Sequence, residues 1–439
     1  MSNQSTRPAE AVNEASAAYR LQAGKAALLR PGYKMTEVGV IPEDWASSPL
    51  GKHASFRTGP FGSALHKSDY ANDGIPVINP MHIINGKIEP TRTMTITEQA
   101  AKNLSEFRLK PGEIVIGRRG DMGRCAVVQE NQSGWLCGTG SMIIRPLNTD
   151  AEFLQRVLSS PRAISAIEDS SVGTTMVNLN QGTLAGLKIQ FPPLPEQKAI
   201  AAALSDVDAL LDGLERLIAK KRDLKQAAMQ QLLTGQTRLP GFSGEWEIKR
   251  LGDLAKFYKG KGLPKSALTP FGSEPCIHYG ELFTQYGETI RETISRTDKN
   301  TGDFRSVAND VLMPTSDVTP RGLAKASCVV IDEVVLGGDI LVIRTDPAQV
   351  CGTFLSHVIR REEDQVLRLV TGTTVFHLYG TDMKKFVLKL PLLAEQQAIV
   401  EVLADMDAEL AVLEARRDKT RALKQGMMQE LLTGKTRLL

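Results

Sequence analysis

The feature that most constrains this chain is a long segment that occurs twice. Residues 194–239 and 393–438 align without a gap at an offset of 199 residues, and 26 of the 46 aligned positions are identical. Shorter signatures before these segments also recur, such as Trp45 with Trp246. Self-similarity at a fixed period means that one structural unit has been built twice. The sequence therefore predicts two related globular domains, each followed by one copy of the long segment.

Both copies of the long segment have the periodicity of a coiled-coil helix. Apolar residues recur in steps of four and three, which places them on one side of a helix as a heptad seam. A polar stretch interrupts the seams at Lys221 and Thr420, and we expect the register to shift there, to Leu224 and Leu423. The predicted seam consists of Ile200, Leu204, Val207, Leu211, Leu214 and Ile218 in the first copy and of Ile399, Leu403, Met406, Leu410, Leu413 and Arg417 in the second.

Each helix is predicted to end at a glycine, Gly235 or Gly434, because glycine accepts the left-handed conformation that closes many helices. About 39 residues at 1.5 Å per residue give a rod of ~58 Å. A rod with one apolar seam is not stable alone in water. Its partner is either the other copy, in an antiparallel pair with approximate two-fold symmetry, or its own globular domain. The first arrangement would hold the two domains at a fixed distance.

Length and composition indicate a multidomain protein of the cytoplasm. A chain of 439 residues exceeds the size of a single hydrophobic core. Five cysteines are scattered without a C-x-x-C pair, as expected for a reducing compartment. The first residues lack the apolar core of a signal peptide, and no apolar run approaches the ~20 residues that span a bilayer. The net charge of +3 does not indicate a nucleic-acid partner, so a polyanion site must come from local patches.

The repeats divide the chain into five segments, and the domains are predicted to be of the α+β class. Short apolar strands separated by turn residues are expected near 112–116, 125–128, 141–145, 326–331 and 339–344, with helices at 151–159 and 352–361. The Ala- and Leu-rich part of the leader, Ala9–Leu29, is either a helix or a loosely held arm. The segments are a leader over 1–40, a first domain over 41–193, a central helix over 194–240, a second domain over 241–392 and a distal helix over 393–439.

Three loops of the first domain carry side chains that suit contact with a nucleic acid. The glycine-rich loop Gly59–Ser63 lets the backbone approach a partner closely. The loop Gly117–Arg124 has three arginines, and arginine makes the commonest specific contact to guanine. The alternative is a plain surface turn for the first loop and a solvated hairpin for the second. The third stretch, Thr174-Thr175 with Asn178, either contacts DNA or caps local structure. The candidates are Phe61, Ser63, Lys67, Arg118, Arg119, Arg124, Thr174, Thr175 and Asn178.

The second domain carries different side chains in the corresponding loops. Its glycine-rich loop is more basic, which suits phosphate contacts. The stretch Met313–Gly322 has Thr, Ser, Asp and one arginine where the first domain has three arginines, as expected if the two domains read different sequences. The candidates are Lys259, Lys261, Lys265, Thr315, Ser316, Arg321, Thr373, Thr374, His377 and Tyr379.

We find no catalytic constellation and no metal-ligand spacing in the sequence. Thr433–Thr436 resembles the end of a P-loop, but the glycine required five residues before Gly434 is Gln429. Asn79-Pro80 begins like an amino-methyltransferase motif that the next residues do not continue. This absence favours a binding protein over an enzyme.

Together these features resemble the specificity subunit of type I restriction-modification systems. The resemblance rests on the opening VGVIPEDW at Val38–Trp45, the GPFGS loop, the helix start PLPEQKAI at 193–200 and the duplicated LLTGxTRL endings. With the tandem domain–helix layout it covers nearly the whole chain. The leader of 40 residues departs from the usual pattern.

The resemblance implies that each domain is a target-recognition domain that reads one half of a bipartite site in double-stranded DNA. It implies that the paired helices set the unread spacer and dock two modification (methyltransferase) subunits, through which up to two restriction subunits join. S-adenosylmethionine, ATP and magnesium are expected on these partners, while this chain is expected to bind no cofactor and to catalyse no reaction. A rod of ~58 Å can span half-sites about one helical turn, ~34 Å, apart.

Two other classes of protein remain open. A self-contained methyltransferase or nuclease would bind S-adenosylmethionine or a metal as a single chain. A coiled-coil scaffold unrelated to DNA would neither co-purify with a methyltransferase subunit nor bind DNA in a complex.

Overall fold

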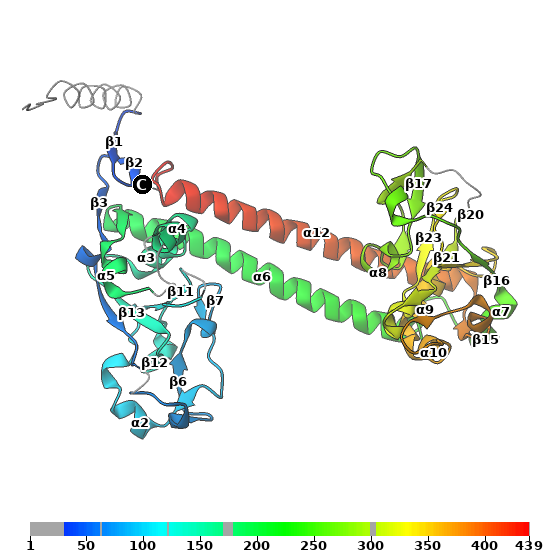
Figure 1. Ribbon diagram of the computed structural model, residues 1–439, viewed down its shortest axis with the longest axis horizontal. Coiled ribbons are helices and arrows are strands. Elements are labelled where there is room, and N and C mark those ends of the chain that lie inside the picture. The colour runs from blue at the N-terminus through cyan, green and yellow to red at the C-terminus, as the bar shows by residue number, and fades with distance from the viewer. Residues whose placement is uncertain (1–29, 62–63, 121–122, 170–178, 299–303, 439) are drawn as a thin grey trace, which may run out of the picture. The chain divides into compact units, whose positions relative to one another are not determined.

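The structure is a computed structural model, and it describes residues 30–61, 64–120, 123–169, 179–298 and 304–438. The chain forms two compact units (Figure 1). Unit 1 consists of residues 1–213 and 417–439, and unit 2 consists of residues 214–416. Each unit therefore holds one globular domain and part of each long helix. The leader expected over 1–40 lies outside the described residues up to position 29.

The domain of unit 1 is built around a four-stranded antiparallel sheet in the order β11-β10-β13-β4. Alternate residues of β10, one of its two inner strands, enter two cores: Ile114 and Ile116 lie in one, and Val115 in the other. Because both faces are covered, the strand is a continuous apolar run and does not alternate with polar residues. The strands of this sheet are β4 (Ala54–Thr58), β10 (Ile114–Gly117), β11 (Cys125–Val127) and β13 (Ser141–Pro146).

A second sheet and several short elements complete the domain of unit 1. The second sheet, in the order β12-β6-β9-β5, contains β5 (Tyr70–Ala71), β6 (Ile75–Ile78), β9 (Thr95–Ile96) and β12 (Leu136–Cys137). Two-stranded pairs are β1 (Tyr33–Thr36) with β2 (Gly39–Pro42), β3 (Ala46–Pro49) with β14 (Lys188–Phe191), and β7 (Ile83–Ile84) with β8 (Lys87–Ile88). The short helices are α2 (Glu98–Lys102), α3 (Ala151–Leu158), α4 (Pro161–Asp169) and α5 (Gln181–Gly186).

The domain of unit 2 repeats this plan. Its main sheet has the order β16-β25-β21-β23-β18, and its second sheet the order β19-β17-β24-β20. The main sheet contains β16 (Ala255–Lys259), β18 (Thr289–Ile290), β21 (Asp310–Pro314), β23 (Ser327–Val329) and β25 (Ile340–Thr345). The second contains β17 (Glu274–Ile277), β19 (Ser295–Thr297), β20 (Phe304–Arg305) and β24 (Val335–Leu336).

The remaining elements of unit 2 form short pairs and helices. β15 (Glu247–Arg250) pairs with β27 (Val387–Leu390), and β22 (Ser316–Asp317) pairs with β26 (Phe376–His377). The helices are α7 (Leu251–Leu254), α8 (Glu281–Thr284), α9 (Gly352–Arg361), α10 (Glu363–Leu367) and α11 (Gly380–Met383). The predicted α+β class is confirmed, and the short strands and helices named for the two domains are present with ends shifted by up to two residues. The candidate helix at Ala9–Leu29 lies outside the described residues.

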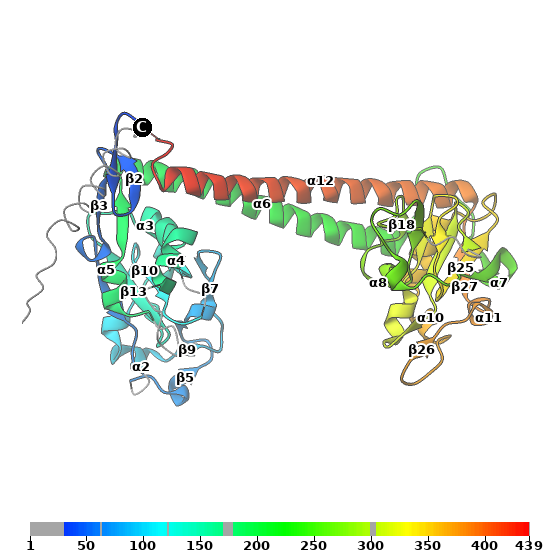
Figure 2. The same ribbon diagram turned by 45° about the horizontal axis from the view of Figure 1, so that its top comes forward.

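The two duplicated segments are single long helices, α6 (Leu194–Leu232) and α12 (Leu393–Leu431). In unit 1, Ile200 and Leu204 of α6 share a core with Leu431 of α12. In unit 2, Leu232 of α6 shares a core with Ile399 of α12. In both units the start of one helix meets the end of the other, so the helices pack antiparallel, and both ribbon views show them side by side (Figures 1 and 2).

The predicted seam residues are mostly buried between the helices and the domains. Phe153 of the first domain joins the core of Ile200 and Leu204, and Phe354 of the second domain joins the core of Ile399. Each helix therefore packs on its own domain as well as on the other helix. Val207, Met406, Leu413 and Arg417 are half-buried, and Ile200, Leu204, Leu211, Leu214, Ile218, Ile399, Leu403 and Leu410 are buried.

The predicted shift of register is wrong. Leu224 and Leu423, the expected new seam positions, are 46% and 58% exposed. The original heptad steps instead continue through Lys225 and Lys424, whose side chains are half-buried, to Leu232 and Leu431. A lysine stem can follow an apolar seam while its ammonium group reaches a carboxylate at the edge.

Each of these lysines finds its carboxylate on the opposite helix. In unit 1, Lys424 Nζ lies 2.6 Å from Asp208 Oδ1, and in unit 2 Lys225 pairs with Asp407. The two pairs are related by the offset of 199 residues. Polar contacts at seam positions of this kind fix the register of paired helices at some cost in stability.

A buried carboxylate joins each helix start to its domain and to the end of the other helix. In unit 1, Glu196 is fully buried and accepts hydrogen bonds from Trp45 Nε1 at 2.9 Å and from Arg437 Nε at 2.6 Å. In unit 2, Glu395 accepts from Trp246 Nε1 at 3.2 Å and from Arg238 Nε at 2.5 Å. Hydrogen bonding to the carboxylate raises the pKa of both arginines.

Glycines close the ends of both helices in the way the sequence predicts. Gly235 and Gly434 both have φ of +71°, in the left-handed region that favours glycine. Each lies against the indole ring of the same cluster: the nearest ring atoms to an added Cβ would be 3.2 Å away, on Trp246 and Trp45 respectively. The turn after each helix therefore brings the arginine to the buried carboxylate.

Candidate nucleic-acid interface

Two predicted loops of the first domain, those that follow β4 and β10, meet at one end of its main sheet. β4 and β10 end there and β13 begins there, because Met142 pairs with Thr58 and Ser141 with Gly117. The loop after β4 exposes Phe61, which is 73% exposed. The predicted residues Phe61 and Arg118 thus belong to neighbouring loops of one surface.

The close approach of two backbone segments at this end of the sheet requires a glycine. Gly59 N donates to Ser141 O at 3.0 Å, and a Cβ on Gly59 would lie only 2.0 Å from the carbonyl oxygen of Gly138. In unit 2, Gly260 N donates to Ile340 O at 2.9 Å, with the same 2.0 Å approach to a glycine carbonyl. The glycine-rich loops are therefore fixed parts of the framework in both domains.

The two arginines that follow β10 have different roles. Arg118 Nε donates to Leu179 O at 3.0 Å, and its half-burial lowers its pKa. Part of this guanidinium is therefore used to hold the returning chain. Arg119 is exposed, and Arg124 is half-buried where the hairpin returns to β11. Among the described residues of this loop, Arg119 presents the most accessible guanidinium.

Several predicted residues of the first domain lie outside the described part of the chain. They are Ser63, Thr174, Thr175 and Asn178, together with the side chain of Lys67, whose backbone lies in a short 3₁₀ helix (Lys67–Asp69). The described residue nearest to the threonines, Leu179, donates its N–H to Arg118 O at 2.9 Å.

In the second domain the structure joins two stretches that are far apart in sequence. Ser316 pairs with His377, and Asp317 with Phe376, in the ribbon of β22 and β26. The rings of His377 and Tyr379 are stacked with centroids 6.1 Å apart, and Tyr379 is 53% exposed. Thr373 and Thr374 are exposed just before this ribbon. Five of the predicted residues therefore form one surface.

The basic loop and the neighbouring stretch are less uniform than predicted. Lys261 and Lys265 are exposed, while Lys259 Nζ lies 3.1 Å from Asp339 Oδ1. Arg321 is exposed and lies 3.3 Å from a glutamate on α10. Thr315 is only 9% exposed, so it supports the loop from inside and offers little surface to a ligand.

One backbone bond identifies equivalent positions in the two domains. Leu179 N donates to Arg118 O at 2.9 Å in the first, and Leu378 N donates to Thr315 O at 3.0 Å in the second. Arg118 and Thr315 therefore occupy the same place in the framework, and Arg119 corresponds to Ser316. This pair of equivalent positions is called the slot. It carries the cationic side chains of Arg118 and Arg119 in the first domain and the small neutral ones of Thr315 and Ser316 in the second.

The sequence did not single out an aromatic pair that borders the second slot. Tyr279 and Phe283 pack edge to face with ring centroids 6.2 Å apart, and they line a small pocket with Ser316 and Asp317. Tyr279 lies in a stretch that aligns with residues 74–82 of the first domain. Aromatic residues within a repeated but divergent stretch were the available signal.

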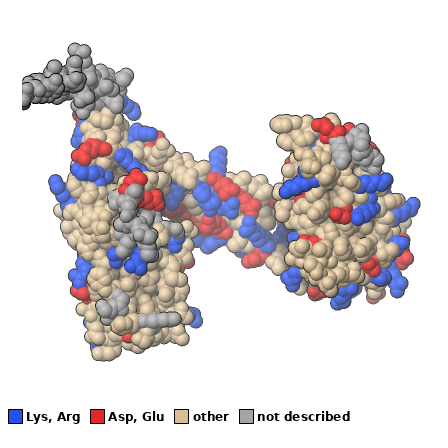
Figure 3. Space-filling model, viewed as in Figure 1, with Lys and Arg blue, Asp and Glu red and all other residues tan. Residues whose placement is uncertain are grey.

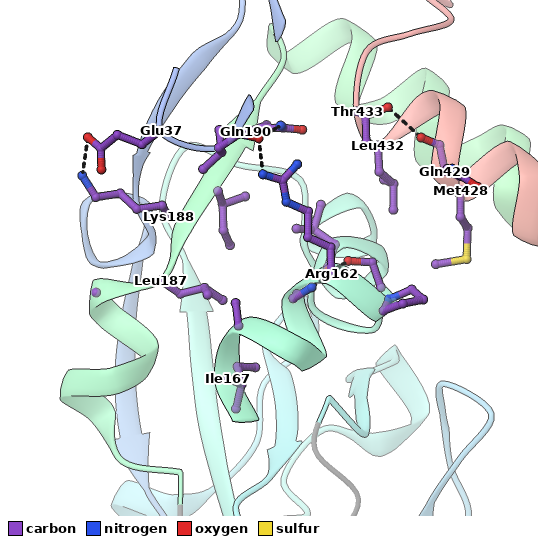
Figure 4. A pocket seen from close by; sticks show the side chains of 18 of the residues that line it. Glu37, Arg162, Ile167, Leu187, Lys188, Gln190, Met428, Gln429, Leu432 and Thr433 are labelled. Atoms are coloured by element: carbon purple, nitrogen blue, oxygen red, sulfur yellow. Dashed lines mark hydrogen bonds and ion pairs between the residues drawn. The ribbon is translucent and has the colours of Figure 1, made fainter. Parts of the chain in front are cut away.

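A larger apolar groove, with a volume of about 980 Å³, lies in unit 1 (Figure 4). Its described walls come from α4, α5, β14 and the last turns of α12. Figure 4 shows Arg162 reaching toward Gln190, with Met428 of α12 and Leu432, just after α12, on the other side. Arg162 and Gln190 both donate to the carbonyl oxygen of Val38. The guanidinium of Arg162 and the amide of Gln190 therefore both serve the backbone.

A single difference between the domains accounts for part of this groove. In unit 2, Gln365 of α10 accepts from Val387 N at 2.6 Å and donates to Val387 O at 2.9 Å, so it bridges the open edge of β27. At the offset of 199 residues, unit 1 has Ala166 and Lys188, and both line the groove. The short alanine leaves the edge of β14 uncovered.

Charge is distributed without a continuous basic face in the view of Figure 3. Lysine and arginine side chains are interspersed with acidic ones along the long helices and over both domains there. Within the described residues, no group of three or more His, Cys, Asp or Glu side chains is arranged to hold a metal ion. In that same part of the chain, no helix is both long and apolar enough to cross a membrane. All five cysteines are free thiols.

Comparison with known proteins identifies the repeated unit. The chain matches the family described as the type I restriction modification DNA specificity domain twice, over residues 42–222 and 243–420. It is 24% identical over 429 residues to a putative type I restriction enzyme MjaX specificity subunit of Methanocaldococcus jannaschii, which covers 92% of this chain and 97% of that protein. It is also 24% identical over 206 residues to the EcoKI specificity subunit of Escherichia coli K12, covering 45% and 43%.

Solved structures show the same fold. The HsdS subunit from Thermoanaerobacter tengcongensis has a TM-score of 0.50 at 18% identity, covering 90% of this chain and 98% of that one. The type I restriction-modification S subunit from M. genitalium has a TM-score of 0.56 at 17% identity, covering 92% and 99%. The family matches extend over more than half of the chain, which therefore belongs to the type I restriction-modification specificity subunits.

Proposed function

We propose that each domain reads one half of a bipartite site in double-stranded DNA, and that the pair formed by α6 and α12 sets the unread spacer between the halves. The observation that carries this proposal is that both domains share the same backbone framework while the side chains in the slot differ. The backbone hydrogen bonds that shape this end of the sheet are the same in both domains, while the side chains at Arg118–Arg119 and Thr315–Ser316 differ. A protein that read one repeated sequence would need the same side chains in both slots.

The chemistry of the two slots supports different half-sites. An accessible arginine such as Arg119 suits a bidentate contact to guanine in the major groove. The exposed Lys261 and Lys265 suit contacts to phosphates, which position a protein but carry no sequence information. With a net charge of only +3, much of the phosphate contact is expected to come from partner subunits.

The helices also serve assembly in this proposal. Two methyltransferase subunits, which bind S-adenosylmethionine and methylate adenine, dock on them, and up to two restriction subunits that use ATP and magnesium join through these partners. The chain itself catalyses no step and binds no cofactor, and the complex works in the cytoplasm. Co-purification with the methyltransferase subunit, and no S-adenosylmethionine binding by this chain alone, are the expected results.

Exchange of one domain tests the division of the DNA site. Residues 41–193 are replaced with the corresponding domain of another specificity subunit, and the methylated motif is read by sequencing genomic DNA. Only one half of the motif should change. The matched exchange of residues 241–392 should change only the other half, and a change in both halves, or in neither, would refute the proposal.

Lengthening both helices tests the spacer. One heptad is inserted after Gly213 in α6 and one after Val412 in α12, positions that correspond at the offset of 199 residues. Seven residues add about 10.5 Å of helix, equivalent to about 3 base pairs. The spacer of the methylated motif should widen by about that amount while the two half-sites stay unchanged. In the control, one existing heptad of each helix is replaced with the inserted sequence, so that the helices keep their original length. An unchanged spacer in the longer protein would contradict the role of the helices.

A further inference from the structure

A small pocket in unit 2 opens beside the ribbon of β22 and β26. Its volume is about 270 Å³. It lies within the slot that corresponds to the arginine loop of the first domain, yet its walls are mainly apolar. The lining residues are Tyr279, Gly280, Phe283, Ser316, Asp317, Val318 and Val375.

The walls of this pocket are packed against one another before any ligand binds. The Tyr279 and Phe283 rings meet at 86°. A Cβ on Gly322 would lie 1.9 Å from Asp317 Oδ2 and 3.0 Å from Phe283 Cε1, so the loop is drawn tightly onto the aromatic side chains. A pocket held in this way can select a group by shape.

The carboxylate at the pocket is occupied by its own loop. Asp317 Oδ1 accepts from Val318 N at 2.7 Å, and Asp317 Oδ2 accepts from Thr319 Oγ1 at 2.6 Å. A carboxylate that reads DNA accepts a hydrogen bond from the amino group of cytosine. Both oxygens of Asp317 shape the loop, and each keeps one lone pair. The half-buried carboxylate is less accessible to a base than the exposed Val318.

The exposed groups of the pocket are aliphatic. Val318 is 71% exposed and Val375 is 44% exposed, although they lie between polar candidate residues. Among the groups that bases present in the major groove, the C5-methyl group of thymine is the one that apolar side chains recognise. We propose, on the basis of the function proposed above, that this pocket receives the C5-methyl group of one thymine in the half-site read by the second domain.

The consequence is a difference in chemistry between the two half-sites. The first domain presents guanidinium groups, which favour guanine, and the second presents a methyl pocket with Val318 and Val375 at its mouth. Burial of one methyl group contributes ~0.8 kcal/mol, which changes an equilibrium or rate constant about four-fold. The effect is therefore expected at one base pair and is small enough to need a direct comparison.

Replacement of thymine with deoxyuridine removes only this methyl group and tests the inference. The complex of this chain with its methyltransferase subunits is assayed on short unmethylated duplexes that carry the recognition motif. Each thymine of the second domain's half-site is replaced in turn, and kcat/KM for methyl transfer is measured. One position should lose about four-fold, whereas replacements in the spacer should have no effect. If no replacement in this half-site changes kcat/KM, the inference is wrong.

Variants of the pocket give the second readout. In Val318→Ala and Val375→Ala, the loss caused by deoxyuridine at the sensitive position should shrink toward none, because the contact is already absent. Val307→Ala, at a position in unit 2 that is likewise 44% exposed but does not line the pocket, is the control and should keep the full loss. A deoxyuridine effect of the same size in the valine variants would overturn the assignment.

Exchange of residues 241–392 separates this inference from the function on which it rests. If the exchange changes one half of the motif but no deoxyuridine effect depends on the valines, the methyl pocket is refuted and the reading role stands. If the exchange leaves the motif unchanged, both are refuted.

Discussion

Removal of the Arg437 guanidinium is expected to loosen the end of α12 from the start of α6 within unit 1. Glu196 is fully buried, and Arg437 donates to its two carboxylate oxygens at 2.6 and 2.8 Å. Trp45 Nε1 supplies a further hydrogen bond at 2.9 Å. Among the described contacts of Glu196, Arg437→Ala would leave only the indole, and the buried carboxylate would have no cation beside it.

The expected cost follows from this geometry. Breaking a buried ion pair on one side costs ~3–5 kcal/mol, because a charge stays buried without its partner. The Arg437 side chain is 26% exposed, so water can replace part of the lost contact, and we expect a value near the lower end, about 3 kcal/mol. The more exposed pair of Arg437 with Asp44 adds at most ~1 kcal/mol. A cost of about 3 kcal/mol raises the population of the open form a little over 100-fold.

The pH of the measurement matters because Asp44 titrates. The hydrogen bond from Arg437 lowers the pKa of Asp44 below its usual value. Its contribution is therefore present above the unfolded pKa of about 3.9 and is lost as the pH falls through the lower folded value. Measurements at pH 7 capture the whole effect.

Amide hydrogen exchange of the full chain, followed by mass spectrometry of peptides, measures local opening in each unit. In Arg437→Ala, peptides from the start of α6 and the end of α12 should exchange about 100-fold faster. Lys435→Ala is the control, because Lys435 lies 3.8 Å from Glu430 at an exposed site and should change little. Arg238→Ala should produce the same effect in unit 2, where Arg238 bonds to Glu395. Equal exchange in Arg437→Ala and Lys435→Ala would refute the reasoning.

Three further predictions concern stability within single units. Ala166→Gln should stabilise unit 1 by ~1 kcal/mol in urea unfolding, because Gln365 bridges the equivalent strand edge in unit 2, and a loss of stability would contradict this. Burial lowers the pKa of His357 although Glu288 opposes the shift, so the stability of unit 2 should be full above the unfolded pKa of about 6.5 and fall toward pH 5; His357→Gln should remove this dependence of the urea midpoint. Gly59→Ala should destabilise unit 1 by ~1–3 kcal/mol, since its Cβ would lie 2.0 Å from a carbonyl oxygen, and an unchanged melting temperature would show that the loop can move.

The long helices were predictable because their signal is local and repeated. The heptad steps and the exact offset locate helix starts at Leu194 and Leu393, where the structure has them. The register prediction failed at Lys225 because a pattern of apolar residues cannot show that an ammonium group will meet Asp407, 182 residues further along the chain. Contacts between distant segments decide which polar residue can lie at a seam.

The candidate site was predictable in its loops but not in how the loops meet. Glycines and arginines mark turns and possible ligand contacts one loop at a time. The ribbon that joins Ser316 to His377, and the burial of Thr315 beneath it, depend on pairing across the domain. The pocket formed by Tyr279 and Phe283 was missed because Tyr279 lies in a turn and Phe283 in α8, which has only four residues, too few for a periodic signal.

The way in which the slots are held explains how two domains of one framework can read different bases. The hydrogen bonds that hold the slot in each domain join backbone atoms, such as Leu179 N to Arg118 O and Leu378 N to Thr315 O. Backbone groups are the same in every residue except proline, so the side chain at these positions can change without loss of the bond. The glycines that allow close approach have no side chain to vary. Specificity can therefore change in the slot while the framework and the helices, which fix the register through Lys424 and Asp208, stay as they are.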